Sequence, residues 1–192
     1  MFQVRIHGRG GQGVVSGAEM LSVAAFIEGR YAQAFPSFGS ERMGAPVMAF
    51  CRIDAKEIRL REPVLEPDAV IIQDPTLLHQ VDLFKGLSDR GYILINSTRS
   101  FKELGLEDFT RGFDRHRLCN VPATELAMKH VGRPVPNAPL LGAFAAISGQ
   151  VKIESVVAAI REKFAPALAQ KNVAAASEAY ALVRSTEETA DA

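Results

Sequence analysis

A glycine-rich segment near the N-terminus limits the folds open to this chain more than any other feature. Residues 2–7 alternate in hydrophobicity as a strand does, and residues 14–28 carry apolar side chains at helical spacing. Between them, residues 8–13 read Gly-Arg-Gly-Gly-Gln-Gly, and Gly29 follows the helical stretch as a stop. A strand, a tight glycine turn and a helix form the first half of a βαβ unit, so an α/β fold is predicted.

The length and the later pattern favour one domain of this class. The chain has 192 residues, the usual size of a single domain, and contains no linker or repeat. Short apolar runs predict buried strands at residues 69–73, 92–95 and 117–121. Apolar periodicity predicts helices at residues 76–84, 123–130, 140–149, 155–164 and 173–183. We therefore predict one Rossmann-like domain with a mostly parallel sheet over residues 1–185.

Four segments are expected to depart from regular βα alternation. Residues 32–46 are rich in proline and glycine and are predicted to be a loop. Residues 47–53 and 57–60 resemble two strands around a short polar turn, which predicts an inserted β-hairpin. Residues 133–139 are predicted to be extended, and residues 186–192 to form a polar C-terminal tail that frays.

Composition excludes several functional classes. Lys and Arg total 22, as do Asp and Glu, so the basic surplus of a nucleic-acid-binding protein is missing. The two cysteines, Cys51 and Cys119, are too few for a disulfide framework or an iron–sulfur cluster and are expected to be buried thiols. The four histidines are scattered, so no metal site is expected. No apolar run could span a membrane and no signal pattern precedes the first strand, so we expect a cytoplasmic protein.

The glycine turn is a candidate binding site with three interpretations. Its members are Gly8, Arg9, Gly10, Gly11, Gln12 and Gly13. They match the dinucleotide pattern G-x-G-x-x-G, in which Gly8 would take a positive φ and the unpaired amides at the helix start would favour an anion. A nicotinamide site also needs an acidic residue at the end of a second strand about 20 residues later, and none is placed there. A phosphate-bearing ligand such as coenzyme A, or close approach of a partner chain or helix, are the other interpretations.

The loop that follows is a candidate contact surface. Residues 37–46 combine glycine, charge and aromatic side chains, a mixture typical of an interface. The interface residues would be Phe38, Gly39, Ser40, Glu41, Arg42 and Met43. An ordinary exposed turn with a local Glu41–Arg42 charge pair is the alternative. We expect neither a nucleic acid nor a membrane as the partner.

Four blocks of this sequence resemble a known family. They are residues 7–15, residues 36–46 with 52–54 after them, residues 74–77, and residues 136–144. Together they resemble the gamma subunit, or gamma domain, of 2-oxoacid:acceptor oxidoreductases such as pyruvate:ferredoxin oxidoreductase. The resemblance spans residues 1–184, and the second block at the right distance from the first makes it specific.

The resemblance implies a function that the motifs alone do not. The family oxidatively decarboxylates a 2-oxoacid on thiamine diphosphate, passes electrons through iron–sulfur clusters to ferredoxin or another acceptor, and releases an acyl-CoA. Its gamma part is a Rossmann-like domain associated with coenzyme A, whereas thiamine diphosphate, magnesium and the clusters belong to companion subunits. By this resemblance the chain is a subunit with no catalytic residue and no activity alone, and the 2-oxoacid would be pyruvate, 2-oxoglutarate or an aryl-glyoxylate. The alternatives are a stand-alone NAD(P)-dependent oxidoreductase and a structural interaction protein.

Overall fold

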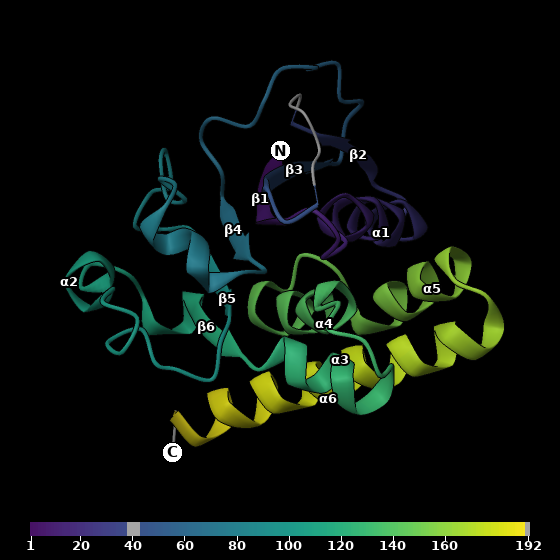
Figure 1. Cartoon of the computed structure of the whole chain (residues 1–192). Coiled ribbons are helices and arrows are strands. Elements are labelled where there is room, and N and C mark those ends of the chain that lie inside the picture. The colour runs from purple at the N-terminus through teal and green to yellow at the C-terminus, as the bar shows by residue number, and fades with distance from the viewer. Residues whose placement is uncertain (38–42, 191–192) are drawn as a thin grey trace.

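One mixed β-sheet organises the computed structural model, which describes residues 1–37 and 43–190 (Figure 1). Its strand order is β2-β3-β1-β4-β5-β6. The strands are β1 (Phe2–Arg9), β2 (Tyr31–Pro36), β3 (Pro46–Asp54), β4 (Ala69–Ile72), β5 (Tyr92–Asn96) and β6 (Leu118–Val121). Strands β1, β4, β5 and β6 are parallel, whereas β3 is antiparallel to both β1 and β2. The predicted α/β fold with a mostly parallel sheet and an inserted hairpin is therefore confirmed.

One face of this sheet is covered by helices, which are α1 (Val14–Ile27), α3 (Ala123–His130), α4 (Asn137–Ser148), α5 (Ile153–Lys163) and α6 (Pro166–Ala190). The other helical segments are α2 (Glu107–Thr110) and the 3-10 turns η1 (Pro75–His79) and η2 (Arg115–Arg117). Figure 1 shows α1 and α4 beside the sheet, with α5 and α6 beyond them. Helix α4 is the centre of this layer, since eleven of its twelve residues are buried. It crosses α6 closely, because a Cβ on Gly142 would lie 2.0 Å from the carbonyl oxygen of Ala176.

The opposite face of the sheet has a thinner cover. In β4, Ala69 and Ile71 join the core beneath α1 and α4, while Val70 and Ile72 join a second, smaller core with Leu77 of η1. Period-two alternation thus gives each face of the strand its own apolar cluster. Figure 1 shows η1, α2 and connecting segments on this side. None of the described α-helices longer than four residues covers it.

The inserted hairpin differs from its prediction. The loop prediction for residues 32–46 is wrong at its start, because β2 occupies Tyr31–Pro36 and pairs with β3. Residues 57–60, predicted to pair with β3, form no strand. Strand β3 already has β1 on one side and β2 on the other, so no free edge remains for them. The signal of β2 was obscured by Pro36, which an edge strand tolerates.

Helix boundaries also differ from the periodicity at three places. The helix predicted at residues 76–84 is only the 3-10 turn η1, and beyond it the carbonyls of Leu83 and Lys85 accept hydrogen bonds from Arg5. Helix α4 begins inside the segment predicted to be extended, and α6 starts earlier and continues to Ala190 through part of the predicted fraying tail. The remaining predicted elements are confirmed within a few residues. Among the described residues no helix is long and apolar enough to cross a membrane.

Candidate functional site

The glycine turn connects β1 to α1, and each glycine has its own steric reason. Gly11 and Gly13 have φ of 95° and 75°, in the left-handed region that favours glycine. The prediction of a positive φ at Gly8 is wrong, because Gly8 is still part of β1. Gly8 is instead required by packing, since a Cβ there would lie 2.6 Å from Cγ2 of Val14. At Gly13 a Cβ would lie 2.6 Å from Nδ2 of Asn137, so the start of α1 packs against the start of α4.

The close neighbour of Gly10 is a later part of the same chain. The Gly10 amide donates to the Ala45 carbonyl at 2.9 Å, and the Gly44 amide donates to the Gly10 carbonyl at 3.1 Å. Gly10 also forms an isolated parallel bridge with Met43. The structure therefore brings the two predicted site segments together, and the room left at Gly10 is filled by residues 43–45.

Arg9 mainly stabilises the turn. Its guanidinium donates to Oδ2 of Asp74 at 3.1 Å and to the Gly44 carbonyl at 3.1 Å. It also donates to Oγ1 of Thr76 at 2.8 Å and to Oε1 of Gln80 at 3.1 Å. Because a guanidinium has five donors, one remains for another group.

Gln12 completes this network around Asp74. Its Oε1 accepts from the Arg9 amide at 2.7 Å, and its Nε2 donates to Oδ2 of Asp74 at 2.9 Å. Burial by itself opposes ionisation of Asp74, but hydrogen bonds from Thr76 and Gln12 and the charge of Arg9 hold its pKa below the ordinary value. Asp74 is thus an ionised anchor that ties the turn to the end of β4.

Asp74 also bears on the nicotinamide interpretation. The second strand of the chain, β2, ends at Pro36 with no acidic side chain. The acid that follows the strand beside β1 is Asp74, 66 residues after Gly8, and its oxygens already accept from Arg9, Gln12 and Thr76. A ribose-binding carboxylate must be free to accept from a sugar hydroxyl. This geometry does not favour a dinucleotide.

The start of α1 leaves donors unused. Gly13 is its N-cap without a side-chain hydrogen bond, and the first helical amide bond runs from Gly17 to the Gly13 carbonyl. The amides of Val14, Val15 and Ser16 precede that bond and have no intrahelical acceptor. They border an open depression of about 530 Å³, which is also lined by Arg9 and Met43. Three donors and a positive helix end form an anion-accepting surface.

A row of buried amides lies behind the turn. The Gln73 amide N–H donates to the His7 carbonyl at 2.7 Å, and Asn96 Nδ2 donates to the Gln73 carbonyl at 2.8 Å. Oε1 of Gln73 is buried and lacks a partner among the described residues. Asn137, which is 3% exposed, donates from Nδ2 to the Gly13 carbonyl at 3.4 Å. The sequence pattern did not single out these three amides as site residues, because they come from three distant segments.

Topology places these groups where α/β sheets bind ligands. Strand β1 leads into α1 on one face, whereas the neighbouring β4 leads into η1 on the other face. A crevice at the carboxyl ends of strands opens where successive connections leave on opposite faces. Here the Arg9–Asp74 ion pair crosses it. The part of the turn that borders an open depression is accordingly its outer side, together with the start of α1.

The predicted interface loop lies largely outside the described residues. Of its members, Phe38, Gly39, Ser40, Glu41 and Arg42 are not described, so their contact role stays a prediction. Met43 is described and is 88% exposed. Its Sδ lies 2.8 Å from the position that a Cβ on Gly11 would take, so this side chain lies against the turn.

The cysteines provide no reactive group. Cys51 and Cys119 are both buried, and burial raises the pKa of each thiol to about 12. Among residues 1–37 and 43–190, no three His, Cys, Asp or Glu side chains form a group that could hold a metal ion.

Three comparisons relate the chain to known proteins. The pyruvate ferredoxin/flavodoxin oxidoreductase family matches residues 3–182. The chain is 48% identical over 180 residues to the pyruvate/ketoisovalerate oxidoreductases common subunit gamma of Pyrococcus furiosus, covering 94% of this chain and 96% of that one. It is 49% identical over 187 residues to pyruvate synthase subunit PorC of Methanosarcina barkeri, covering 97% and 100%. The crystal structure of pyruvate oxidoreductase subunit PORC from Thermotoga maritima superposes with a TM-score of 0.79 at 37% identity, covering 94% and 95%.

Proposed function

The chain belongs to the pyruvate ferredoxin/flavodoxin oxidoreductase family, and from this premise we propose that it is the gamma subunit of a complex that oxidatively decarboxylates a 2-oxoacid to an acyl-CoA. The observation that carries the proposal is the match over nearly the whole chain to relatives named as gamma or PorC subunits. We propose pyruvate as the 2-oxoacid, because it is the substrate common to the names of the relatives compared above, one of which is also named for ketoisovalerate. A ferredoxin-type acceptor takes the electrons.

The residues of this chain support a role without catalysis. A cluster held by cysteines needs four of them, and this chain has two, both buried. Thiamine diphosphate supplies the carbanion chemistry of decarboxylation when bound, and we place it, with magnesium and the iron–sulfur clusters, on companion subunits. This chain then contributes two things, a folded surface that packs beside the companion subunits and the helix start of α1 as a binding site.

Coenzyme A is the ligand that we propose for that start. Its phosphates need donors and positive potential, and the amides of Val14, Val15 and Ser16 at an uncapped helix N-terminus supply both. Arg9 has one donor left for a phosphate oxygen. The residues fit a phosphate group, with the amides as main donors and Arg9 as an auxiliary one.

Reconstitution tests the subunit assignment. The tagged chain is produced with the companion subunits from its own source and purified. We expect it to bring down larger subunits that carry thiamine diphosphate and iron–sulfur clusters, and the complex to reduce a viologen dye with pyruvate and coenzyme A. The chain alone should reduce none. Turnover by the isolated chain, or a tagged chain that purifies without companions, would refute the assignment.

A charge variant tests the coenzyme A site. An acidic residue in the first helical turn stabilises the helix but repels a phosphate. Ser16→Asp should therefore leave the stability of the fold unchanged or higher while weakening the binding of coenzyme A. A repulsion of about 1 kcal/mol predicts a roughly fivefold rise in the KM for coenzyme A with the KM for pyruvate unchanged. The matched control is Ser16→Asn, which keeps the shape without the charge. Equal KM values for coenzyme A in the two variants would place it elsewhere.

A further inference from the structure

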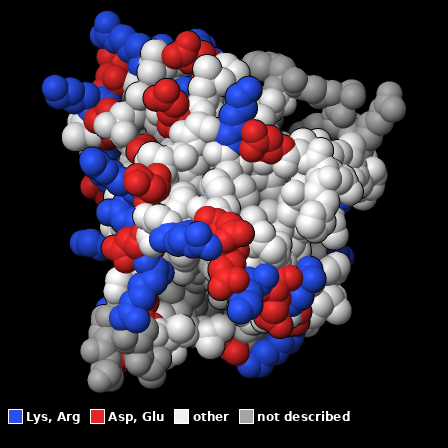
Figure 2. Space-filling view, turned by 90° about the vertical axis from the view of Figure 1, so that its left-hand side faces the viewer, with Lys and Arg blue, Asp and Glu red and all other residues white. Residues whose placement is uncertain are grey.

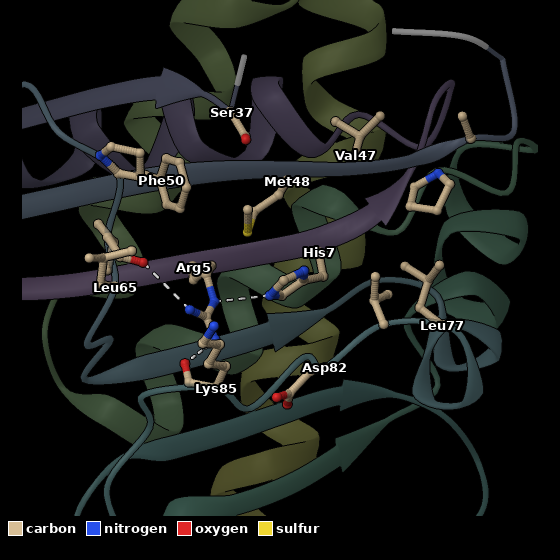
Figure 3. A pocket seen from close by; sticks show the side chains of 15 residues that line it. Arg5, His7, Ser37, Val47, Met48, Phe50, Leu65, Leu77, Asp82 and Lys85 are labelled. Carbon is tan, nitrogen blue, oxygen red and sulfur yellow. Dashed lines mark hydrogen bonds between the residues drawn. The ribbon is translucent and has the colours of Figure 1, made fainter. Parts of the chain in front are cut away.

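A second cavity lies on the thinly covered face of the sheet and shares Val47 with the depression at the start of α1. It has a volume of about 720 Å³, within the range of ligand-sized sites. Figure 3 shows its lining side chains, which come from β1 and β3, from η1 and from connecting segments. Main contributors are Arg5, His7, Met48, Phe50, Leu65 and Leu77. Nothing proposed above uses this cavity.

Arg5 forms part of the cavity floor and uses four of its five guanidinium donors to hold the frame. Its Nη2 donates to the carbonyls of Leu83 and Lys85 at 2.8 and 2.7 Å, and its Nη1 reaches the Val64 carbonyl at 3.5 Å. These bonds tie β1 to two connecting segments that border the cavity. A buried guanidinium satisfied by carbonyls is a structural cation, so the frame is preformed.

His7 presents one unused hydrogen-bond donor. The Nε–H of Arg5 donates to Nε2 of His7 at 3.1 Å, as the dashed line in Figure 3 shows. Burial, with a smaller contribution from the charge of Arg5, lowers the pKa of His7 to about 3, so the ring is neutral at physiological pH. A neutral imidazole that accepts at Nε2 carries its proton at Nδ1. His7 is 7% exposed, and its Nδ1 has no acceptor among the described residues.

The rim of the cavity exposes large apolar side chains. Leu65 is 73% exposed and Val81 is 42% exposed. Asp82 and Lys85 also line the cavity and carry opposite charges, so the rim has no net charge. Figure 2, which looks at the left-hand side of Figure 1, shows a broad area right of centre with few charged side chains. A cavity rim with exposed apolar side chains and no net charge is typical of a surface that another protein covers.

We propose that this cavity receives an apolar segment of a companion subunit, with a carbonyl or hydroxyl oxygen of that segment accepting from Nδ1–H of His7. This inference rests on the proposed gamma-subunit role, which supplies the companion. Sheets of this class are normally covered on both faces, and here the described helices cover mainly one. The companion would provide the missing layer.

The exposed rim favours a protein segment over a small ligand. A small molecule in the cavity would satisfy His7 but leave Leu65 in water, because that side chain projects at the rim. A companion surface covers the rim and fills the cavity at once. Asp82 and Lys85 balance each other's charge, so the companion segment needs no charge to match the rim. Its side chains near the rim are therefore expected to be apolar or uncharged polar.

Cysteine reactivity tests the proposal on the assembled complex. Leu65→Cys places a thiol on the rim, while Cys51 and Cys119 are buried and react slowly. A maleimide reagent should label this variant quickly in the isolated chain and at least tenfold more slowly in the complex. The matched control is Phe26→Cys on α1, where the parent side chain is 71% exposed and α1 covers the opposite face. It shows that the reagent still reaches an exposed thiol.

An assembly variant adds a second measurement. Leu65→Asp puts a charge on the rim and leaves the core unchanged, so the isolated chain should keep its melting temperature. Recovery of the companion subunits with this variant should fall at least tenfold. The control is Phe26→Asp, which puts the same charge on α1. A thiol labelled equally fast in the isolated chain and the complex, with normal assembly of Leu65→Asp, would overturn the proposal but leave the subunit role intact. Protection that appears in the isolated chain with rising concentration would identify a second copy as the occupant and also overturn it. A chain that recruits no companions would refute both this proposal and the proposed function.

Discussion

Replacing Gly13 by alanine tests the reason given for the glycine at the start of α1. Two costs are expected. The left-handed backbone at φ 75° costs an alanine about 1–2 kcal/mol. The new Cβ would lie 2.6 Å from Nδ2 of Asn137 and 3.3 Å from Cγ1 of Val135. Asn137 must then move, which disturbs its bonds to the Gly13 carbonyl and the Ala138 amide at about 0.5–1.5 kcal/mol each.

Gly29→Ala is the matched control, because it shares only the first of these costs. Gly29 has φ 78°, yet a Cβ there would meet nothing within 4 Å. We therefore expect a loss of about 1–2 kcal/mol for Gly29→Ala and about 2–5 kcal/mol for Gly13→Ala. For a chain of this size each kcal/mol lowers the melting temperature by about 2–4 °C.

Urea unfolding of the two variants and the parent measures the difference directly. Adding Asn137→Ala to Gly13→Ala should cost less than the sum of the two single changes, because the second change removes the clash. If Gly13→Ala and Gly29→Ala lost the same free energy of unfolding, the turn would not depend on contact with α4, and the steric reasoning would be refuted.

Three further predictions concern other parts of the molecule. Gly142→Ala should lower the free energy of unfolding by about 2–4 kcal/mol or prevent folding, because its Cβ would lie 2.0 Å from the Ala176 carbonyl oxygen. The control Gly112→Ala, where a Cβ meets open space, should change the melting temperature little. Similar melting temperatures for the two variants would contradict the close crossing of α4 and α6. The pKa of His7 is about 3 in the folded chain and 6.5 as its ordinary value, so on acidification the unfolded chain binds the proton first. The contribution of His7 to the free energy of unfolding of the parent should therefore fall by about 2 kcal/mol between pH 7 and pH 5. The variant His7→Gln should lack that component in urea titrations at both pH values, and an unchanged pH dependence would show that the imidazole is not held neutral. Finally, NADH fluorescence should show no saturable binding to the chain, since Asp74 is already bonded to Arg9 and Gln12, and a micromolar dissociation constant would favour the dehydrogenase alternative.

The sequence was sufficient for the features that depend on local pattern. The strand, glycine turn and helix at residues 2–28 and the buried parallel strands follow from periodicity that one segment contains. It was insufficient wherever a distant partner decides. Strand β2 forms where β3 offers it an edge, and residues after η1, predicted to continue a helix, instead lie where Arg5 of β1 donates to the carbonyls of Leu83 and Lys85.

The same distinction applies to the site. The turn was identified from its glycines, and its arginine and glutamine were assigned as ligand contacts. In the structure Arg9 and Gln12 mainly hold Asp74, a residue more than sixty positions away. No local pattern connects these positions, because the pairing arises only when β4 lies beside β1. For the same reason the buried amides of Gln73 and Asn137 could not be placed at the site from sequence.

The inserted hairpin also affects the order in which the chain becomes structured during synthesis. Strands β1, β2 and β3 and helix α1 lie within the first 54 residues, and β3 pairs with both other strands. The pairing among these three strands needs no later residue, although the other edge of β1 stays unpaired until β4 arrives. Contacts of short sequence separation form fastest. Residues 1–54 can therefore adopt their hairpin and helix soon after leaving the ribosome, with the apolar side of β1 and α1 exposed until α4 arrives. We expect this interval, from about residue 54 to residue 148, to be when the nascent chain most needs chaperone protection.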